Sequence, residues 1–313
     1  MLITVAIACY QSENTIESVV HQAIAAIKRR KENDYQIILV SDGSRDDTFK
    51  KIQNLCEKDS KILGIELTKN YGQENAKLTA ISYAQGDVLV SMDDDGEHPA
   101  EKIYELIDKL DEGYDAVFAK FTHKTHNLFR KFCSAANAKV LTYIGVIPKG
   151  VFFSGFFAMN RLCIDLLKQY NSPFPSLGAY LTNVTSRMTN VEMEQLNRLS
   201  GKSGYTLHKL ISLWLTNVVS FSMKTIRVAS VVGLFSSSIG ILLSIVLIVR
   251  KIVNPDIAMG YTSIMSTILI VGGIIMLIVG LMGEFIGKTY MTISDLPRAT
   301  VRKEINIIKN ENN

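Results

Sequence analysis

The chain has 313 residues, of which 47% are hydrophobic and 20% charged, a composition typical of a folded protein rather than a disordered one. The formal net charge of +4 is too small to argue for or against nucleic-acid binding, and nucleic acid is not among the partners we expect. The four cysteines show neither paired spacing nor histidine partners, which is typical of reduced thiols in a cytosolic domain.

The first part of the chain alternates short apolar runs with segments of helical spacing. We expect strands at 2–9, 35–41, 62–67, 88–92 and 115–121, with helices at 15–31, up to about residue 58, at 74–84 and at 99–110. This alternation predicts an α/β domain with a mostly parallel sheet covered by helices on both faces. Because the first strand follows Met1 at once, we expect no signal peptide.

Three consecutive carboxylates, Asp93, Asp94 and Asp95, follow the fourth strand, and Glu97 comes two residues later. Open α/β sheets bind their ligands at the carboxyl ends of the strands, so we expect these acids at a ligand site. Along an extended chain Asp93 and Asp95 face the same way. Two carboxylates on the same side could bind Mg²⁺ or Mn²⁺, with the phosphates of a substrate supplying further oxygen ligands. The alternative is a solvated acidic turn before the helix that begins near Pro99.

Other polar residues follow the first two strands and are expected at the same edge of the sheet. Asp42, which precedes a turn at Gly43, is placed to accept hydrogen bonds from a base or a ribose. Tyr10 is placed to stack on the base, with Glu13 nearby. Because carboxylates alone would repel a diphosphate, a bridging Mg²⁺ or Mn²⁺ is required, and it would stabilise charge on the departing nucleotide phosphate.

Two segments near the C-terminus, 228–249 and 257–283, contain no charged residue. About 20 apolar residues are enough to span a bilayer, so we expect transmembrane helices at 226–251 and 257–285. A pair of buried core helices is the alternative. Within residues 204–225 the apolar side chains, Trp214 among them, recur at helical spacing and would form a stripe along one face. This pattern predicts an amphipathic helix at the membrane surface. A helix packed on the core of the domain is the other interpretation of this stripe.

Basic residues flank the two spans on their outer sides. They favour placing both chain termini in the cytoplasm, with residues 286–313 as a basic cytoplasmic tail. Arg250 and Lys251, which lie between the two uncharged segments, weaken this orientation signal. Gly283 and Gly287 form a Gly-x-x-x-Gly pair at the end of the second span, a pattern that permits a homo-oligomer through helix pairing.

Six short motifs occur in a characteristic order: Ala8-Cys-Tyr-Gln-Ser-Glu13, Val40-Ser-Asp-Gly-Ser44, Lys69-Asn-Tyr-Gly72, Met92-Asp-Asp-Asp-Gly-Glu-His-Pro99, Arg198-Leu-Ser-Gly-Lys-Ser-Gly-Tyr205 and Gly283-Glu-Phe-Ile-Gly-Lys-Thr-Tyr290. With them, nearly the whole chain resembles the inverting nucleotide-sugar glycosyltransferases that share the Rossmann-like GT-A fold. More narrowly, it resembles the polyisoprenyl-phosphate glycosyltransferases, which include dolichol-phosphate mannose synthase and bacterial undecaprenyl-phosphate sugar transferases. The two spans are the most specific part of this resemblance.

The resemblance implies a cytoplasmic GT-A domain over residues 1–203 and assigns roles to particular side chains. It implies a nucleotide-sugar site formed by Ala8, Tyr10, Glu13, Asp42, Lys77, Asp93 and Asp94. It implies a metal held by Asp93, Asp95 and Glu97, and catalytic roles for Asp93, Asp94 and Asp95. It implies an acceptor-phosphate site formed by Lys120, Arg130, Ser134, Arg198 and Lys202. A basic face near anionic lipid headgroups is the alternative for the last set.

The chain also departs from the family pattern. Gly155 and Phe157 stand where many bacterial relatives have Asp and Arg. If that Asp is a general base in relatives, this chain lacks it. A lipid phosphate is already ionised at neutral pH and needs no base, whereas a sugar hydroxyl does. The departure therefore favours a phosphate acceptor, although Asp94 or Asp95 remains a candidate base.

The resemblance implies an integral membrane enzyme, in the plasma membrane or bacterial inner membrane. It would transfer a sugar from a nucleotide-diphosphate sugar to a polyprenyl phosphate at the cytoplasmic face, with inversion. The product would supply cell-wall or lipopolysaccharide glycan assembly. One alternative is a glycan or glycolipid hydroxyl as acceptor, although the processive signature Gln-x-x-Arg-Trp is absent. The other is a degenerate domain that acts as a non-catalytic scaffold.

Overall fold

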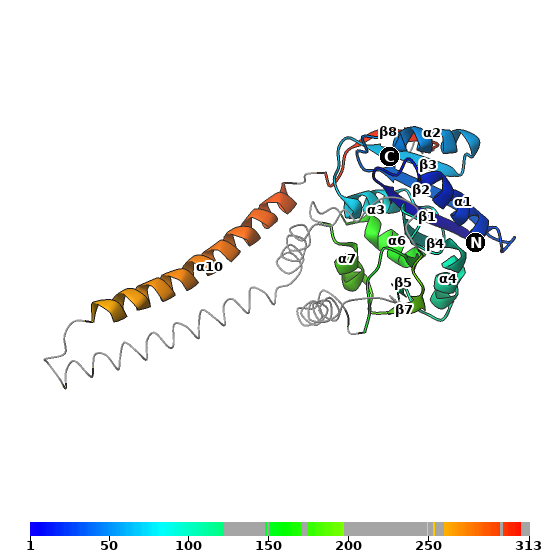
Figure 1. The fold of residues 1–313 in the computed structure, drawn as a ribbon. Coiled ribbons are helices and arrows are strands. Elements are labelled where there is room, and N and C mark those ends of the chain that lie inside the picture. Colours follow the sequence, from blue (N-terminus) through cyan, green and yellow to red (C-terminus); the bar gives the residue numbers. More distant parts are fainter. Residues whose placement is uncertain are drawn as a thin grey trace. The chain divides into compact units, whose positions relative to one another are not determined.

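The computed structural model describes residues 1–121, 148, 150–170, 175–196, 249, 253, 260–294 and 297–307. The chain divides into two compact units. The sheet unit comprises Met1–Thr206 and Asp295–Asn313, and the helical unit comprises Leu207–Ser294. An eight-stranded sheet with the order β7-β5-β6-β4-β1-β2-β3-β8 forms the centre of the sheet unit (Figure 1).

Four parallel strands form the middle of the sheet. Strand β1 (Leu2–Cys9) lies between β2 (Asp34–Ser41) and β4 (Val88–Asp93), and β3 (Ile62–Leu67) pairs with the far side of β2. Seven of the eight positions of β1 are buried, as expected for a strand that is covered on both faces. The predicted mostly parallel sheet is confirmed, and these four strands match the predicted segments within a residue.

The remaining part of the sheet contains an antiparallel strand that the sequence did not predict. Strand β6 (Phe157–Asn160) pairs antiparallel with both β4 and β5 (Ala116–Phe121), while β7 (Met188–Met193) runs parallel to β5. The sheet is therefore mixed. The insertion of β6 between β4 and β5 brings the glycine-containing segment before Phe157 to the end of β4.

Helices cover both faces of the sheet, as predicted. On one face α1 (Ile16–Ile27) contacts α2 (Thr48–Lys58), the short helix η1 (Ala100–Lys102) and α4 (Ile103–Asp111). On the other face α3 (Gln73–Ser82) packs on β1 and β2 and contacts α6 (Arg161–Lys168), which in turn contacts α7 (Leu177–Val184). Each large apolar side chain buried in this way contributes about 1.5–3 kcal/mol to the stability of the unit.

The segment after the helical unit returns to the sheet unit. Strand β8 (Val301–Ile305) pairs antiparallel with β3 and forms an edge of the sheet (Figure 1). The Asn306 side chain then donates hydrogen bonds to the carbonyls of Cys56, at 2.7 Å, and Ile62, at 2.9 Å. The predicted division, which ended the domain at residue 203 and treated 286–313 as a separate tail, therefore missed an integral strand.

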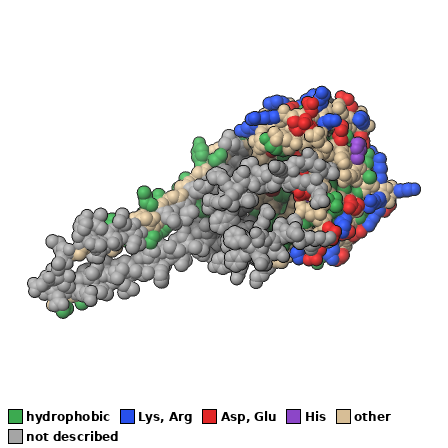
Figure 2. Space-filling model, in the orientation of Figure 1, with side chains coloured by type: hydrophobic (Ala, Val, Ile, Leu, Met, Phe, Trp, Pro, Cys, Tyr) green, Lys and Arg blue, Asp and Glu red, His purple; other side chains and the backbone are tan. Residues whose placement is uncertain are grey.

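The described part of the helical unit is dominated by α10 (Tyr261–Ile293). Its segment Val271–Ile293 is long and apolar enough to cross a membrane, with a mean hydropathy of 1.7. Exposed hydrophobic side chains such as Met276 and Ile286 lie along it, and Figure 2 shows hydrophobic groups projecting from this helix. Within the described residues it is the one helix of this kind. The predicted span at 226–251 and the amphipathic helix at 204–225 lie outside the described residues, apart from Val249.

Candidate active site

The carboxyl ends of β1, β2 and β4 lie level with one another, so the polar residues that follow them gather at one edge of the sheet. In the sheet register Ala8 of β1 pairs with Val40 of β2 on one side and with Asp93 of β4 on the other. Ala8 itself is buried. The predicted convergence of residues from the first, second and fourth strands is therefore present.

Asp42 follows β2 and holds the loop after β3. Its Oδ1 accepts a hydrogen bond from the backbone N–H of Tyr71 at 2.7 Å, and its Oδ2 accepts one from Gly72 at 2.8 Å. Burial raises the pKa of Asp42, and these two hydrogen bonds oppose the rise. The neighbouring Gly43 has a φ of +63°, and a Cβ there would lie 2.4 Å from the carbonyl carbon of Lys69. Asp42 thus organises this edge, and its contact with a nucleotide stays a prediction.

The loop after β1 is hydrogen-bonded to the turn after β4 and to the residue before α2. The backbone N–H of Tyr10 donates to Asp94 Oδ2 at 2.9 Å, while the Tyr10 side chain is 45% exposed. The exposed ring is accessible to a stacking partner. Glu13 Oε2 accepts a hydrogen bond from the backbone N–H of Asp47 at 2.9 Å, next to the start of α2. The predicted roles of Tyr10 and Glu13 toward the nucleotide stay predictions.

Asp93, the last residue of β4, is held by two side chains from α3. Its Oδ1 accepts hydrogen bonds from Lys77 Nζ at 2.8 Å and Gln73 Nε2 at 2.7 Å. Lys77 is only 4% exposed, so this is a largely buried ion pair. Lys77 was predicted to bind the nucleotide sugar, whereas Gln73 was not predicted as a site residue. The position of Gln73 directly after the Lys69–Gly72 motif was the available signal.

His98 lies against the same carboxylate and was also missed as a site residue. Its Nδ1 accepts a hydrogen bond from the backbone N–H of Asp93 at 3.0 Å, and its Nε2 lies 3.6 Å from Asp93 Oδ2. The imidazole stacks on Phe121 and Phe156, with ring centroids 5.6 and 5.2 Å away. Burial lowers the pKa of His98, which favours the neutral ring. Its place within the Met92–Pro99 motif was the signal in the sequence.

The other two aspartates lie in a turn rather than in the strand. Strand β4 ends at Asp93, and Asp94 and Asp95 form a turn before Gly96, so the extended geometry assumed for Asp93 and Asp95 is wrong. Burial raises the pKa of Asp94 to about 6, against the hydrogen bond from Tyr10. Asp95 Oδ1 accepts a hydrogen bond from the backbone N–H of Glu97 at 3.1 Å.

The residues at this edge fit a divalent cation only together with a substrate. No group of three or more His, Cys, Asp or Glu side chains is arranged to hold a metal within the described residues. Glu97, one of the three predicted ligands, accepts a hydrogen bond from Gln195 Nε2, and its carbonyl accepts one from the N–H of Leu196. Mg²⁺ is commonly held by one or two carboxylates plus substrate phosphates. Asp93 and Asp95 supply carboxylates of that chemistry.

The predicted acceptor-phosphate residues fall mostly outside the described residues. Arg130, Ser134, Arg198 and Lys202 all lie there. Lys120, on β5, is described, and its Nζ pairs with Glu192 Oε1 on the adjacent β7 at 2.7 Å. Both side chains of this pair are exposed, so water screens the pair and it contributes little to the stability of the sheet. The role of Lys120 toward an acceptor stays a prediction.

Gly155 lies directly against Asp93. The antiparallel register of β4 and β6 brings residue 155 opposite the end of β4. A Cβ at this position would lie 2.6 Å from Asp93 Oδ2 and 2.9 Å from Oδ1, closer than real contacts allow. With an Asp at residue 155, the carboxylate of Asp93 would have to shift from this position, and the two like charges would repel each other. The glycine that stands here in place of the family's Asp therefore leaves room for the carboxylate of Asp93.

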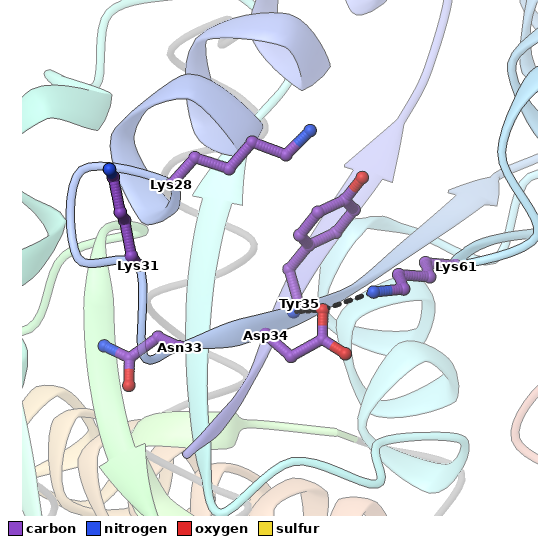
Figure 3. A pocket seen from close by; sticks show the side chains of 6 residues that line it. All are labelled: Lys28, Lys31, Asn33, Asp34, Tyr35 and Lys61. Atoms are coloured by element: carbon purple, nitrogen blue, oxygen red, sulfur yellow. Dashed lines mark hydrogen bonds and ion pairs between the residues drawn. The ribbon is translucent and has the colours of Figure 1, made fainter.

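A separate cavity opens at the opposite end of β2. It is lined by Lys28, Lys31, Asn33, Asp34, Tyr35 and Lys61 (Figure 3). Lys61 Nζ lies 2.5 Å from Asp34 Oδ1, which Figure 3 marks with a dashed line. Asp34 begins β2 and Asp42 follows its end, so at about 3.3 Å per residue the cavity lies roughly 25 Å from the carboxyl-end loops. This cavity is not part of the candidate active site.

Comparison with known proteins gives consistent matches. The model of the family "Glycosyl transferase family 2" matches residues 4–162. The glycosyltransferase YkcC of Bacillus subtilis is 30% identical over 93% of this chain and 91% of its own length. The undecaprenyl-phosphate 4-deoxy-4-formamido-L-arabinose transferase of Proteus mirabilis is 27% identical over 99% and 96%. The bactoprenol glucosyl transferase of Shigella phage SfII is 27% identical over 97% and 98%.

Solved structures give more distant matches. Glucosyl-3-phosphoglycerate synthase from Mycobacterium tuberculosis, in complex with Mn²⁺, UDP-glucose and phosphoglyceric acid, has a TM-score of 0.49 and 19% sequence identity. The match covers 70% of this chain and 78% of that one. The family model spans half of the chain, and YkcC matches it almost from end to end. The chain therefore belongs to glycosyl transferase family 2 and is a glycosyltransferase.

Proposed function

We propose that this enzyme transfers a sugar from a nucleotide-diphosphate sugar to a polyprenyl phosphate at the cytoplasmic face of a membrane. The observation that carries the proposal is the near full-length similarity to relatives named for such acceptors. These are the undecaprenyl-phosphate and bactoprenol transferases, which this chain matches over 97% or more of its length. The similarity includes the segment of α10, which is apolar enough to keep an enzyme beside a lipid that stays in the bilayer.

The packing at Gly155 supports a phosphate as the acceptor. Its missing side chain leaves no base at that position, and Asp93 occupies the adjacent space. A phosphate monoester is ionised at neutral pH, so it can attack the anomeric carbon without losing a proton first. A direct in-line attack of this oxygen breaks the bond to the nucleotide diphosphate and inverts the anomeric centre. The nucleoside diphosphate leaves with the bonding electron pair.

A divalent cation, Mg²⁺ or Mn²⁺, would neutralise the donor diphosphate and the charge that develops on the leaving group. Asp93 and Asp95 would hold it, together with the phosphates of the donor. Lys77 neutralises Asp93 from the side of α3. Tyr10 and Asp42, which line the ends of β1 and β2, would bind the nucleotide.

A donor screen tests this proposal. The full-length protein in detergent or in vesicles is incubated with Mn²⁺, undecaprenyl or dolichyl phosphate and each common nucleotide sugar, and the extracted lipids are analysed by mass spectrometry. We expect one donor to give a lipid whose mass increases by one sugar residue. The Asp93→Asn variant should lose at least 100-fold in rate, because a neutral amide is a much weaker cation ligand.

An exposed acid outside the candidate site provides the matched control. Asp111→Asn, at the end of α4, should keep the rate of the unaltered protein. Failure of every common donor to give a lipid-linked product with metal present would contradict the proposal. Transfer to a glycan or glycolipid hydroxyl instead would establish the alternative acceptor.

A further inference from the structure

We propose that Gln73, Lys77 and His98 are positioning residues that fix the carboxylate of Asp93, and that Gly155 provides the space in which that carboxylate lies. The four residues are called the Asp93 cradle below. The inference rests on the proposed function, since it gives Asp93 its importance in binding the donor and its cation. It assigns new roles to three side chains, Gln73, Lys77 and His98, and to the backbone at one glycine.

The α3 side of the cradle fixes Oδ1. Gln73 and Lys77 are four residues apart on α3, so their side chains leave the same face of the helix and reach the same oxygen. The distances of 2.7 and 2.8 Å are those of strong hydrogen bonds, and the Lys77 bond is charge-assisted. Because Lys77 is almost completely buried, water screens this ion pair weakly.

The His98 side of the cradle fixes the backbone and faces Oδ2. Nδ1 accepts a hydrogen bond from the N–H of Asp93, so in the neutral ring the proton is on Nε2, the nitrogen that faces the carboxylate. Phe121 and Phe156 both stack on the imidazole and restrict its rotation. A single tautomer with a single orientation therefore presents an N–H dipole to Oδ2.

Gly155 completes the cradle by its lack of a side chain. Any Cβ there would meet both carboxylate oxygens of Asp93 within 3 Å. The carboxylate occupies the space that a side chain at residue 155 would need, so any substitution of Gly155 requires Asp93 to move from its contacts with Lys77 and His98. Restoring an Asp at residue 155 is thus expected to displace Asp93 rather than to add a useful base. A carboxylate held in place in this way loses less conformational freedom when a cation and donor bind.

The tautomer of His98 is tested directly by ¹⁵N NMR of the full-length protein, labelled at the histidine side chains, in detergent micelles. The His98→Asn variant identifies the signal of His98 by its loss. Because Nδ1 accepts a hydrogen bond from the backbone N–H of Asp93, we expect Nδ1 to carry no proton and the ring proton to be on Nε2. A proton on Nδ1, or signals of two exchanging tautomers, would overturn the proposal.

Variants at His98 separate positioning from general packing. His98→Phe keeps an aromatic ring between Phe121 and Phe156 but removes both nitrogens, whereas His98→Asn keeps an amide oxygen near the place of Nδ1. We expect His98→Phe to lower kcat at least tenfold and to weaken Mn²⁺ binding, measured by EPR titration with a nucleoside diphosphate present, at least fivefold. We expect His98→Asn to recover most of both, and the KM for the lipid to change less than twofold. Equal behaviour of the two variants would contradict a positioning role.

Gly155 gives an independent test should His98→Phe fold poorly, which circular dichroism would detect. Gly155→Ala should weaken Mn²⁺ binding, and Gly155→Asp should lower the turnover rate further. A rate increase in Gly155→Asp would overturn the inference. If the unaltered protein makes no lipid-linked sugar, the proposed function fails, while the His98 tautomer and the Mn²⁺ titrations still decide on the cradle.

Discussion

Asp42 shows how a single carboxylate can organise a loop that the strands alone do not fix. Its two oxygens accept hydrogen bonds from consecutive backbone N–H groups, those of Tyr71 and Gly72. Both groups belong to the connection between β3 and α3, and α3 carries Gln73 and Lys77. The position of Asp93 therefore depends on Asp42 through the start of α3.

The Asp42→Asn variant tests how strongly the two hydrogen bonds of Asp42 stabilise this loop. An amide has one acceptor oxygen, so one of the two N–H groups would face an NH₂ group and lose its hydrogen bond. We expect the free energy of unfolding of the sheet unit to fall by about 1–3 kcal/mol, measured by urea unfolding at pH 7.5. The exposed Asp111→Asn should change it by less than about 0.5 kcal/mol. Equal stability of the two variants would contradict the account of Asp42.

At this scale the sequence predicted the residues that follow strands and missed those that reach the site from elsewhere. Asp42 and Asp93 are recognisable because a buried apolar run ends just before each of them. Gln73 and His98 both contact Asp93, which is 20 residues from Gln73 and five from His98; their places beside or within motifs mark them as site residues, but the local pattern does not indicate this contact. Gly155 lies close to Asp93 because β6 pairs with β4, and no local sequence pattern specifies that pairing.

At the scale of elements, the parallel strands were predictable and the antiparallel ones were not. Strands β1 to β4 are continuous apolar runs followed by helices, the pattern typical of buried parallel strands. Strand β6 has only four residues, and β8 (Val-Arg-Lys-Glu-Ile) is largely charged, so a sequence interpretation assigns it to a basic tail. Its edge position explains the charges, because one side of an edge strand faces solvent.

Arg298 links the segment before β8 to the rest of the sheet unit. Its Nη1 donates to the carbonyl of Tyr170 at 2.5 Å and its Nη2 to that of Leu78, in α3, at 3.2 Å. Burial lowers the pKa of Arg298, although the group stays charged at any physiological pH. This contact attaches the C-terminal segment to the helix that carries Lys77.

We expect Arg298→Met to lower the free energy of unfolding of the sheet unit by about 1.5–3 kcal/mol, because two carbonyls lose a charged donor. Thermal and urea unfolding of the full chain would measure the change. Arg302→Met, at a largely exposed position on β8, is the matched control and should cost less than about 1 kcal/mol. An Arg298→Met protein as stable as the control would show that the C-terminal segment is only loosely attached.

At the scale of the whole molecule, the chain passes from the sheet unit into the helical unit and back again. Val271–Ile293 would leave a large apolar surface in water, which favours a membrane as its surroundings. We therefore expect the expressed protein to stay in the membrane fraction after extraction with alkaline carbonate, followed by immunoblotting. Release into the supernatant, together with a peripheral control protein, would contradict membrane insertion.

The account as a whole depends on one chemical claim, that the acceptor is an ionised phosphate on a polyprenyl chain. The most direct measurement compares undecaprenyl phosphate with undecaprenol under the same conditions, with the donor identified by the screen and the products analysed by mass spectrometry. We predict a sugar phosphodiester from the phosphate and no product from the alcohol, because the phosphate oxygen is already ionised whereas the hydroxyl must first lose a proton, and Gly155 supplies no base for that step. Efficient transfer to the alcohol, or to a glycan hydroxyl in preference to the phosphate, would contradict the account.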